Sequence, residues 1–255
     1  LLLEAACGAS SARILAHPED ELGAEAAARF EAFLDRRSGG EPVAYITGIA
    51  GFYGRSFRVD PRVLIPRPET ELLVDACLEA LPVDAQADAL DLCAGSGCVG
   101  LTLLAERPGL RLTAVELSAE AAQVARENAA ALGLAGRYEL LEGDLFAPLG
   151  GRAGFRLIAA NPPYVPTGEI ARLAVEVRDH DPRLALDGGA DGLAVIRPLV
   201  AEAARRLASG GTLALEIGEG QGPTVRALLE AAGLSDVRVV RDYARLDRIV
   251  VGSKR

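Results

Sequence analysis

The most informative run in this sequence of 255 residues is Asp91-Leu-Cys-Ala-Gly95-Ser-Gly97-Cys-Val-Gly100. It follows a predicted strand over residues 87–92 and opens a predicted helix over residues 98–107. Its glycines have the spacing G-x-G-x-x-G. Glycine permits a tight turn between strand and helix, and it lets a ligand approach backbone that a Cβ atom would shield. The run therefore predicts a ligand-binding loop, and a tight turn without a ligand is the alternative.

Strands and helices are expected to alternate on both sides of this run. The predicted strands cover residues 87–92, 111–116, 138–142, 155–160, 212–217, 237–241 and 248–251, and the predicted helices cover 70–81, 98–107, 118–132, 191–208 and 221–232. Such alternation predicts an α/β fold with a doubly wound, mostly parallel sheet. Residues 242–247 are too few for a crossover helix, so the last two strands should pair antiparallel. Seven strands with the last one reversed match the outline of the class I methyltransferase fold.

Two smaller regions precede this predicted domain, which spans residues 66–255. Residues 1–38 are Ala-rich with a helical period, and they are interrupted at His17-Pro18. We expect a small N-terminal helical domain that lacks its start, because the chain begins with Leu and contains no Met. Residues 39–65 are expected to form a β-hairpin linker, with strands between Pro42 and Ile65.

Composition narrows the possible functions. The net charge is −9, with 36 acidic and 27 basic residues, whereas duplex DNA binding needs a concentrated basic surface. No apolar run approaches the ~20 residues of a membrane span, and the N-terminus does not resemble a signal peptide. The four cysteines form no C-x-x-C pair and the two histidines lie far from them in sequence, so no metal site is expected.

Acidic residues near the glycine run indicate which ligand it binds. Glu116 ends the second predicted strand, where a carboxylate can accept hydrogen bonds from both ribose hydroxyls. Asp91 precedes the glycines, where it disfavours a pyrophosphate and suits a cationic amino-acid ligand. This combination favours S-adenosylmethionine over NAD. Gly143-Asp144-Leu145 follows the third predicted strand, so Asp144 is expected to bind the adenine amine and Leu145 to cover the ring, unless Asp144 only caps a helical turn.

The tetrapeptide Asn161-Pro162-Pro163-Tyr164 follows the fourth predicted strand and should border the same crevice. An amide or exocyclic amine nitrogen is a poor nucleophile because its lone pair is delocalised. The Asn161 side-chain oxygen and the Pro162 carbonyl can accept hydrogen bonds from both of its N–H groups, and Tyr164 can stack on the planar group. A Pro-rich turn without catalytic function is the alternative.

These motifs together resemble the HemK/PrmC family, which methylates the amide nitrogen (N5) of the glutamine in the Gly-Gly-Gln motif of class I peptide-chain release factors. The resemblance covers essentially the whole chain and includes residues 41–48, 64–71, 91–97, 161–164, 176–189, 215–218 and 241–243. It implies that Cys93, Ala94, Gly95, Ser96, Gly97 and Glu116, with the adjacent Leu117 and with Asn161, bind the methyl donor. It also implies that Asn161, Pro162, Pro163 and Tyr164 bind the substrate. Cys93-Ala94 departs from the Gly-Thr that is more frequent in the family.

The resemblance also implies S-adenosyl-L-homocysteine as product and a cytoplasmic, monomeric enzyme with a protein substrate. Arg67 either guides the substrate or belongs to the start of a helix. Glu216, at the end of a predicted strand, should face the crevice, but the sequence around it indicates no role. Methylation of an exocyclic amine in a nucleic acid is the main alternative, because the same tetrapeptide serves that chemistry. A non-catalytic donor-binding protein and an NAD-dependent oxidoreductase are further alternatives.

Overall fold

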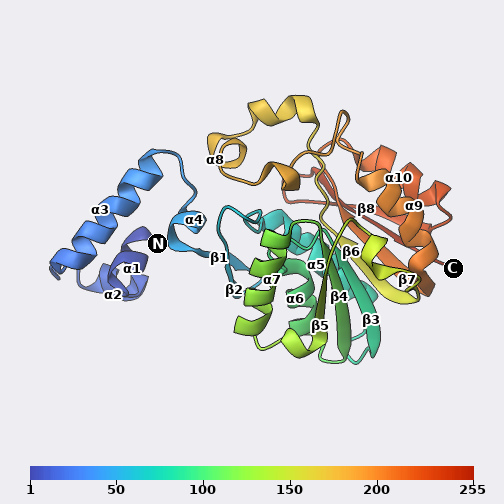
Figure 1. Ribbon diagram of the computed structural model, residues 1–255, viewed down its shortest axis with the longest axis horizontal. Helices are drawn as coiled ribbons and strands as arrows, with labels where there is room; N and C mark the ends of the chain where they lie inside the picture. The colour runs from blue at the N-terminus through green and yellow to red at the C-terminus, as the bar shows by residue number, and fades with distance from the viewer.

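The computed structural model describes residues 1–255 and is built around one seven-stranded sheet (Figure 1). The strands lie in the order β5-β4-β3-β6-β7-β9-β8. Their bounds are β3 Ala87–Leu92, β4 Leu110–Glu116, β5 Tyr138–Glu142, β6 Phe155–Ala160, β7 Leu207–Glu216, β8 Ser235–Arg241 and β9 Asp247–Ser253. Neighbours from β5 to β7 pair parallel, and β9 pairs antiparallel with both β7 and β8. The predicted sheet with a reversed last strand is confirmed.

Helices cover both faces of this sheet (Figure 1). One core cluster of 25 buried residues joins the sheet to α5 Glu71–Ala80, α6 Cys98–Glu106 and α7 Ala119–Ala131. A second cluster of 21 buried residues joins the opposite face to α9 Ile196–Arg206 and α10 Gly222–Ala231. Ala89 contributes to the first cluster and the adjacent Leu90 to the second, because successive strand side chains point to opposite faces.

The predicted end of the helix over 191–208 and the predicted start of the strand over 212–217 are both wrong. The helix ends at Arg206, and β7 begins with Leu207, which pairs with Phe155 of β6. The run Ser209-Gly210-Gly211, which follows Ala208, is typical of a turn. In the structure it lies within β7, where the pairing with β6 shifts register and Gly210 has a φ of 70°.

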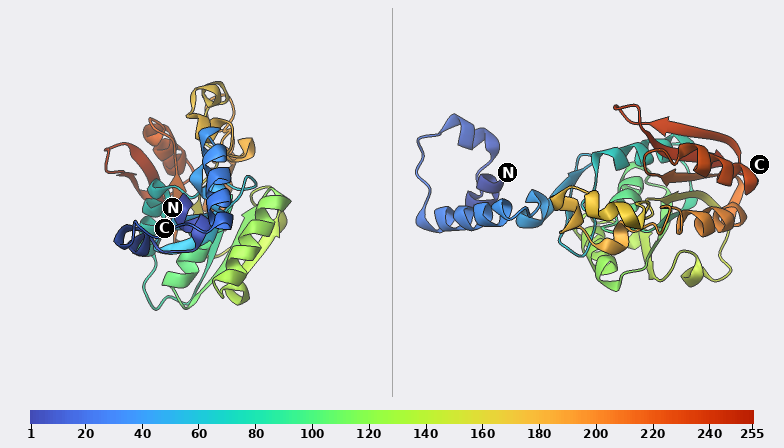
Figure 2. Two further views of the ribbon diagram at one scale, coloured as in Figure 1. Left: turned by 90° about the vertical axis from the view of Figure 1, so that its left-hand side faces the viewer. Right: turned by 90° about the horizontal axis from the view of Figure 1, so that it is seen from above.

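An N-terminal helical unit stands away from the sheet, as Figure 2 shows. It comprises α1 Leu2–Cys7, α2 Ser11–Ala16 and α3 Ala24–Ser38, and α1 packs against α3. Helix α2 ends where His17-Pro18 predicted a break. No residue of α3 is buried, so one face of this unit is open.

The expected strands between Pro42 and Ile65 are only partly correct. Residues Val43–Thr47 form helix α4, because Pro42 precedes it with a φ of −59° and Gly48 ends it in the left-handed conformation with a φ of 76°. The hairpin consists of β1 Ile49–Phe52 and β2 Arg55–Arg58. Both Phe52 and Phe57 belong to the first core cluster, so the hairpin is packed into the sheet domain and is not a free linker.

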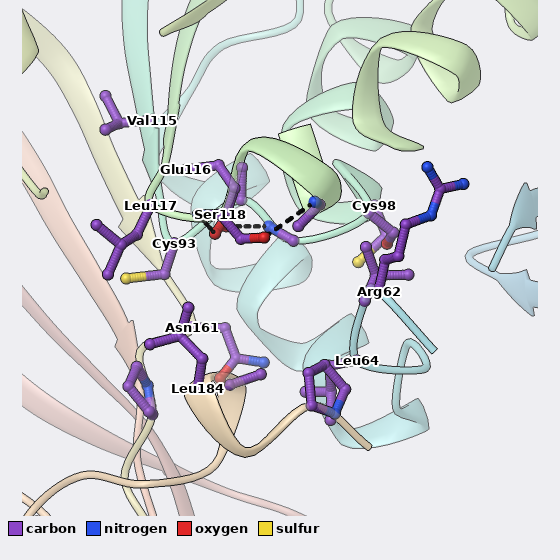
Figure 3. A pocket seen from close by; sticks show the side chains of 18 of the residues that line it. Arg62, Leu64, Cys93, Cys98, Val115, Glu116, Leu117, Ser118, Asn161 and Leu184 are labelled. Atoms are coloured by element: carbon purple, nitrogen blue, oxygen red, sulfur yellow. Dashed lines mark hydrogen bonds between the residues drawn. The ribbon is translucent and has the colours of Figure 1, made fainter. Parts of the chain in front are cut away.

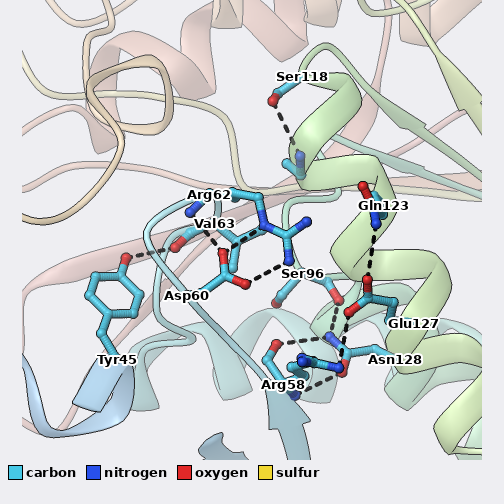
Figure 4. A network of polar contacts seen from close by, with 11 residues as sticks. Tyr45, Arg58, Asp60, Arg62, Val63, Ser96, Ser118, Gln123, Glu127 and Asn128 are labelled. Carbon is cyan, nitrogen blue, oxygen red and sulfur yellow. Dashed lines mark hydrogen bonds and ion pairs between the residues drawn. The ribbon is translucent and has the colours of Figure 1, made fainter. Parts of the chain in front are cut away.

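Asn128 of α7 connects the hairpin to the glycine run (Figure 4). Its Oδ1 accepts a hydrogen bond from the Arg58 N–H at 2.7 Å. Its Nδ2 donates to the Arg58 carbonyl at 3.1 Å and to the Ser96 carbonyl at 2.9 Å. This buried amide therefore links β2 to the loop after β3.

The remaining helical elements are short. They are η1 Pro68–Thr70, η2 Ala135–Arg137, η3 Ala147–Leu149, η4 Thr167–Arg172, α8 Val175–Arg178 and η5 Arg183–Ala185. Elements η4, α8 and η5 lie in the segment between β6 and α9. None of the helices combines the length and apolar character needed to cross a membrane.

Candidate active site

The carboxyl ends of four parallel strands bring the candidate residues together. Ala160 of β6 pairs with Leu92 of β3 on one side and with Leu215 of β7 on the other. The residues that follow these positions, Cys93, Asn161 and Glu216, therefore leave the same edge of the sheet. Glu116 ends β4 at this edge, next to β3. Ligands of open α/β sheets bind at this edge.

A cavity of about 440 Å³ lies over this edge, which is within the size range of small-molecule sites (Figure 3). Most of the expected site residues line it: Arg67, Asp91, Cys93, Ala94, Gly95, Ser96, Glu116, Leu117, Asp144, Leu145, Asn161 and Pro163. Gly97, Pro162 and Tyr164 do not line it. Residues from the segment after β6, including Leu184, close its other side.

The glycine run leaves space for a ligand at Gly95. This residue has a φ of 55°, and a Cβ atom built on it would have no heavy atom within 4 Å. Gly97 has a φ of 80°, and a Cβ there would lie 3.0 Å from Leu101 and from the Tyr138 hydroxyl. Gly97 therefore serves the turn and helix packing, whereas Gly95 exposes backbone to the cavity.

Backbone N–H groups hold the Glu116 carboxylate in place. Oε2 accepts from the Gly95 N–H at 2.8 Å, and Oε1 accepts from the Ser118 N–H at 2.9 Å (Figure 3). A carboxylate has about four acceptor positions, so each oxygen keeps one for a ligand. The arrangement offers two fixed anionic acceptors to a vicinal diol.

Asp91 is buried beneath the glycine run. Its Oδ2 accepts from the Gly100 N–H at 2.9 Å, and a Cβ on Gly100 would approach this oxygen to 2.7 Å. The third glycine of the motif thus makes room for the carboxylate. Burial raises the pKa of Asp91 to about 7, although the Gly100 N–H opposes this shift. A cation in the cavity would favour the ionised form.

Asn161 presents its amide at the cavity while the end of its tetrapeptide is turned away. Its Nδ2 donates to the Thr70 Oγ1 at 3.3 Å, which leaves Oδ1 free as an acceptor. The Tyr164 ring packs against the second core cluster, and its hydroxyl donates to Glu216 at 3.2 Å. This position does not provide the stacking surface that the sequence predicted for Tyr164.

Arg67 lines the cavity and is anchored by a residue that the sequence analysis missed. It forms an ion pair with Asp181, whose side chain is fully buried. The Tyr45 hydroxyl of α4 also hydrogen-bonds Asp181, at 2.7 Å. Burial raises the pKa of Asp181, and the Arg67 cation and the Tyr45 hydroxyl oppose that shift. Because these partners are 114 and 136 residues from Asp181, no local pattern indicates the contact.

Thr70 and Leu184 were also missed as cavity residues. Thr70 ends η1, which begins at Pro68 as the helix-start interpretation of this segment predicted. Leu184 is an exposed apolar residue in η5. Leu184 lies within residues 176–189, which the family resemblance includes, but a single exposed leucine is a weak signal of a binding site.

The fold and the glycine run with its strand-end acids define a class I methyltransferase. Solved structures share this fold: the Thermus thermophilus 16S rRNA N2 G1207 methyltransferase (RsmC) in complex with AdoMet and guanosine has a TM-score of 0.60 at 24% identity, covering 81% of this chain and 50% of that chain. A ribosomal protein L11 methylase from Lactobacillus delbrueckii subsp. bulgaricus has a TM-score of 0.55 at 19% identity, covering 78% of this chain and 86% of the other.

Sequence comparison identifies the particular family. The PrmC N-terminal domain profile matches residues 1–48, and the methyltransferase small domain profile matches residues 69–177. The release factor glutamine methyltransferase of Caulobacter vibrioides is 47% identical over 100% of this chain and 88% of its own length. The Moorella thermoacetica protein of the same name is 45% identical over 100% of this chain and 90% of its own length. The chain belongs to the release factor glutamine methyltransferase family, which confirms the resemblance seen in the sequence.

Proposed function

We propose that the chain transfers a methyl group from S-adenosylmethionine to the side-chain amide nitrogen of the glutamine in the Gly-Gly-Gln motif of class I release factors. Relatives of the chain are named release factor glutamine methyltransferases. The observation that carries the proposal is the free Asn161 Oδ1 in the same cavity as the Glu116 carboxylate and the open Gly95 backbone. One cavity thus contains a hydrogen-bond acceptor for the substrate amide and a binding site for the methyl donor.

The residues at the cavity suit S-adenosylmethionine. Glu116 would bind the ribose diol, and the space at Gly95 would admit the ligand close to the backbone. Asp91 would favour the cationic amino-acid end, and Asp144 with Leu145 would bind the adenine. When bound, S-adenosylmethionine supplies a methyl group on a sulfonium, and its direct displacement by an amide nitrogen gives a methylated amide, S-adenosylhomocysteine and a proton. No metal has a role in this displacement.

The task of the protein is to hold the amide nitrogen in line. Asn161 Oδ1 would accept one N–H of the substrate amide, and the carbonyl of the adjacent Pro162, a residue that does not itself line the cavity, would accept the second. Pro163 lines the cavity beside them, and Tyr164 would fix the loop through Glu216. Arg67, held by Asp181, would contact the polar backbone of the entering loop.

A release factor needs a larger surface than the cavity provides, because standard protein interfaces bury about 1,600 Å². We assign part of this surface to the N-terminal helices and to the hairpin. Among the N-terminal helices, α3 has no buried residue. The substrate would be a soluble protein of the translation machinery, which implies a cytoplasmic enzyme, and the chain would act as a monomer. Nucleic-acid methylation is not favoured, since the net charge is −9.

The test is mass spectrometry of a purified class I release factor after incubation with the chain and S-adenosylmethionine. The expected result is one added methyl group on the Gly-Gly-Gln peptide. A release factor with Asn in place of that Gln serves as the matched control and should stay unmodified. Methyl transfer to nucleic acid alone would refute the proposal.

A further inference from the structure

A buried polar cluster lies next to Asn161, and the proposed reaction does not use it directly. It consists of Thr70 of η1, Tyr164 after β6 and Glu216 at the end of β7. Glu216 is 1% exposed and Thr70 is 2% exposed. Glu216 does not line the cavity, and its Oε2 is buried without a hydrogen-bond partner. A buried, incompletely satisfied carboxylate is costly, so its retention beside the site calls for a function.

The ionised carboxylate determines the direction of every hydrogen bond in this cluster. A carboxylate only accepts, so the Tyr164 hydroxyl donates to Oε1 at 3.2 Å. The Thr70 hydroxyl lies close enough to the Glu216 carboxylate to lower the pKa of that group, so a hydroxyl proton directed at the carboxylate is the favourable orientation. Thr70 Oγ1 then has only lone pairs for Asn161, whose Nδ2 donates to it at 3.3 Å.

We propose that Thr70 and Glu216 are positioning residues that orient the Asn161 amide so that Oδ1, rather than the NH₂ group, faces the substrate nitrogen. This inference rests on the proposed function. An Asn side chain can exchange its oxygen and its NH₂ group by a half turn, which alters little in its shape. With NH₂ toward the cavity, two donor groups would face each other and the substrate amide would lose an acceptor.

Protonation of Glu216 should release this control. A neutral carboxyl group can donate to Thr70, which can then donate to the Asn161 oxygen and favour the wrong orientation. The charged and titratable groups around Glu216 are Arg248 of β9, Glu69 of η1, Cys98 of α6 and Tyr164. Burial raises the pKa of Glu216 to about 7, and Thr70, Tyr164 and Arg248 oppose the shift. Methyl transfer should therefore slow as the pH falls below about 7.

The experiment uses the full chain with Thr70→Val, Thr70→Ser and Glu216→Gln. Thr102→Val is the matched control, because Thr102 is a fully buried threonine of α6 whose hydroxyl has no partner. Single-turnover methylation is measured at saturating S-adenosylmethionine and release factor. Affinity for S-adenosylhomocysteine is measured by calorimetry. The NMR signals of the Asn161 side-chain amide, assigned by their loss in Asn161→Ala, report its hydrogen bonding without methyl transfer.

We expect Thr70→Val to slow single turnover about 10- to 100-fold, the loss typical of partners that orient a functional ligand. Product affinity should stay unchanged, and Thr70→Ser should restore most of the rate. Glu216→Gln should be slow and lack the acidic limb of the wild-type pH profile. The Asn161 amide signals should shift in Thr70→Val and not in Thr102→Val.

Wild-type single-turnover rates in Thr70→Val would overturn the inference, as would equal losses in the Ser and Val variants. If the loss of rate at low pH persists in Glu216→Gln, another group causes it, and the inference is also overturned. Failure of the proposed function is recognised separately, by a wild-type chain that leaves the release factor unmodified. The amide signals still decide the inference in that case, because unmoved signals in Thr70→Val refute it.

Discussion

Replacement of Glu116 by Ala should weaken binding of the methyl donor, and this effect can be measured in the absence of methyl transfer. The structure gives this carboxylate two roles, since it accepts the Gly95 and Ser118 N–H groups and offers its remaining lone pairs to the cavity. The backbone bonds exist with and without ligand, so their loss lowers the free energy of unfolding and largely cancels from affinity. The ribose contacts exist only in the complex.

The expected loss of affinity follows from those contacts alone. Hydrogen bonds to a charged group contribute about 1.5–3 kcal/mol net, which corresponds to an increase of roughly 10- to 150-fold in the dissociation constant. Calorimetric titration with S-adenosylhomocysteine measures this constant directly. Thermal unfolding of the free variant reports the separate loss of the two backbone bonds.

Glu142→Ala is the matched control for the change at Glu116. Glu142 ends β5 directly opposite Glu116 in the sheet register, but it pairs with Arg126 and does not line the cavity. Its removal deletes the same charge from the same edge and should leave donor affinity unchanged. Unchanged affinity in Glu116→Ala would remove Glu116 from the donor site, and equal losses in both variants would indicate a general effect of charge.

Three further predictions concern the amide acceptor, the buried acid and the N-terminal helices. Asn161→Ala and Asn161→Asp should each slow single turnover about 10²- to 10³-fold. The Asp variant should bind the donor at least as well as the wild type, because its negative charge favours the cationic donor in the ground state. A wild-type rate in Asn161→Ala would show that Asn161 is only a turn residue. The pKa of Asp91 is raised from 3.8 to about 7, so the folded chain binds more protons than the unfolded chain in this window, and the contribution of Asp91 to stability falls as the pH rises through it. Binding of a cationic donor should therefore release protons from Asp91 near pH 6, and calorimetry in buffers of different ionisation enthalpy detects this proton release. Asp91→Asn should reduce the number of protons released. Undiminished proton release in this variant would show that another group titrates. A chain that starts at Gly39 keeps the hairpin phenylalanines in the core, so it should retain its affinity for the donor. It should lose methylation of the release factor. Full methylation by this shorter chain would show that the N-terminal helices do not take part in recognition.

Much of the sheet domain follows from local sequence patterns. Apolar runs and glycine spacing predict β3, the turn and α6, because alternation of apolar residues and the conformational freedom of glycine act within a few residues. The antiparallel pairing of β8 and β9 follows from the short connection between them. Parallel strands end at one edge of the sheet, so the mostly parallel sheet that the sequence predicts also brings Glu116 and Asn161 to the same cavity.

Tertiary structure alone decides the orientation of the side chains around that edge. Pro42 and Gly48 are local signals for the helix that carries Tyr45, but no local signal shows that the Tyr45 hydroxyl reaches Asp181, which is 136 residues away. Tyr164 carries no local signal that its hydroxyl bonds Glu216 rather than facing the cavity.

The physical reason is the range of each interaction. Backbone conformation and burial periodicity are set largely by neighbours in sequence, so the sequence by itself determines most of the sheet strands, the glycine turn and the position of Asn161 at a strand end. Hydrogen bonds between side chains depend on which strands and helices become neighbours after folding. Whether Asn161 meets Thr70 and whether Arg67 meets Asp181 are therefore decided only when residues 91 and 114 positions apart are packed together.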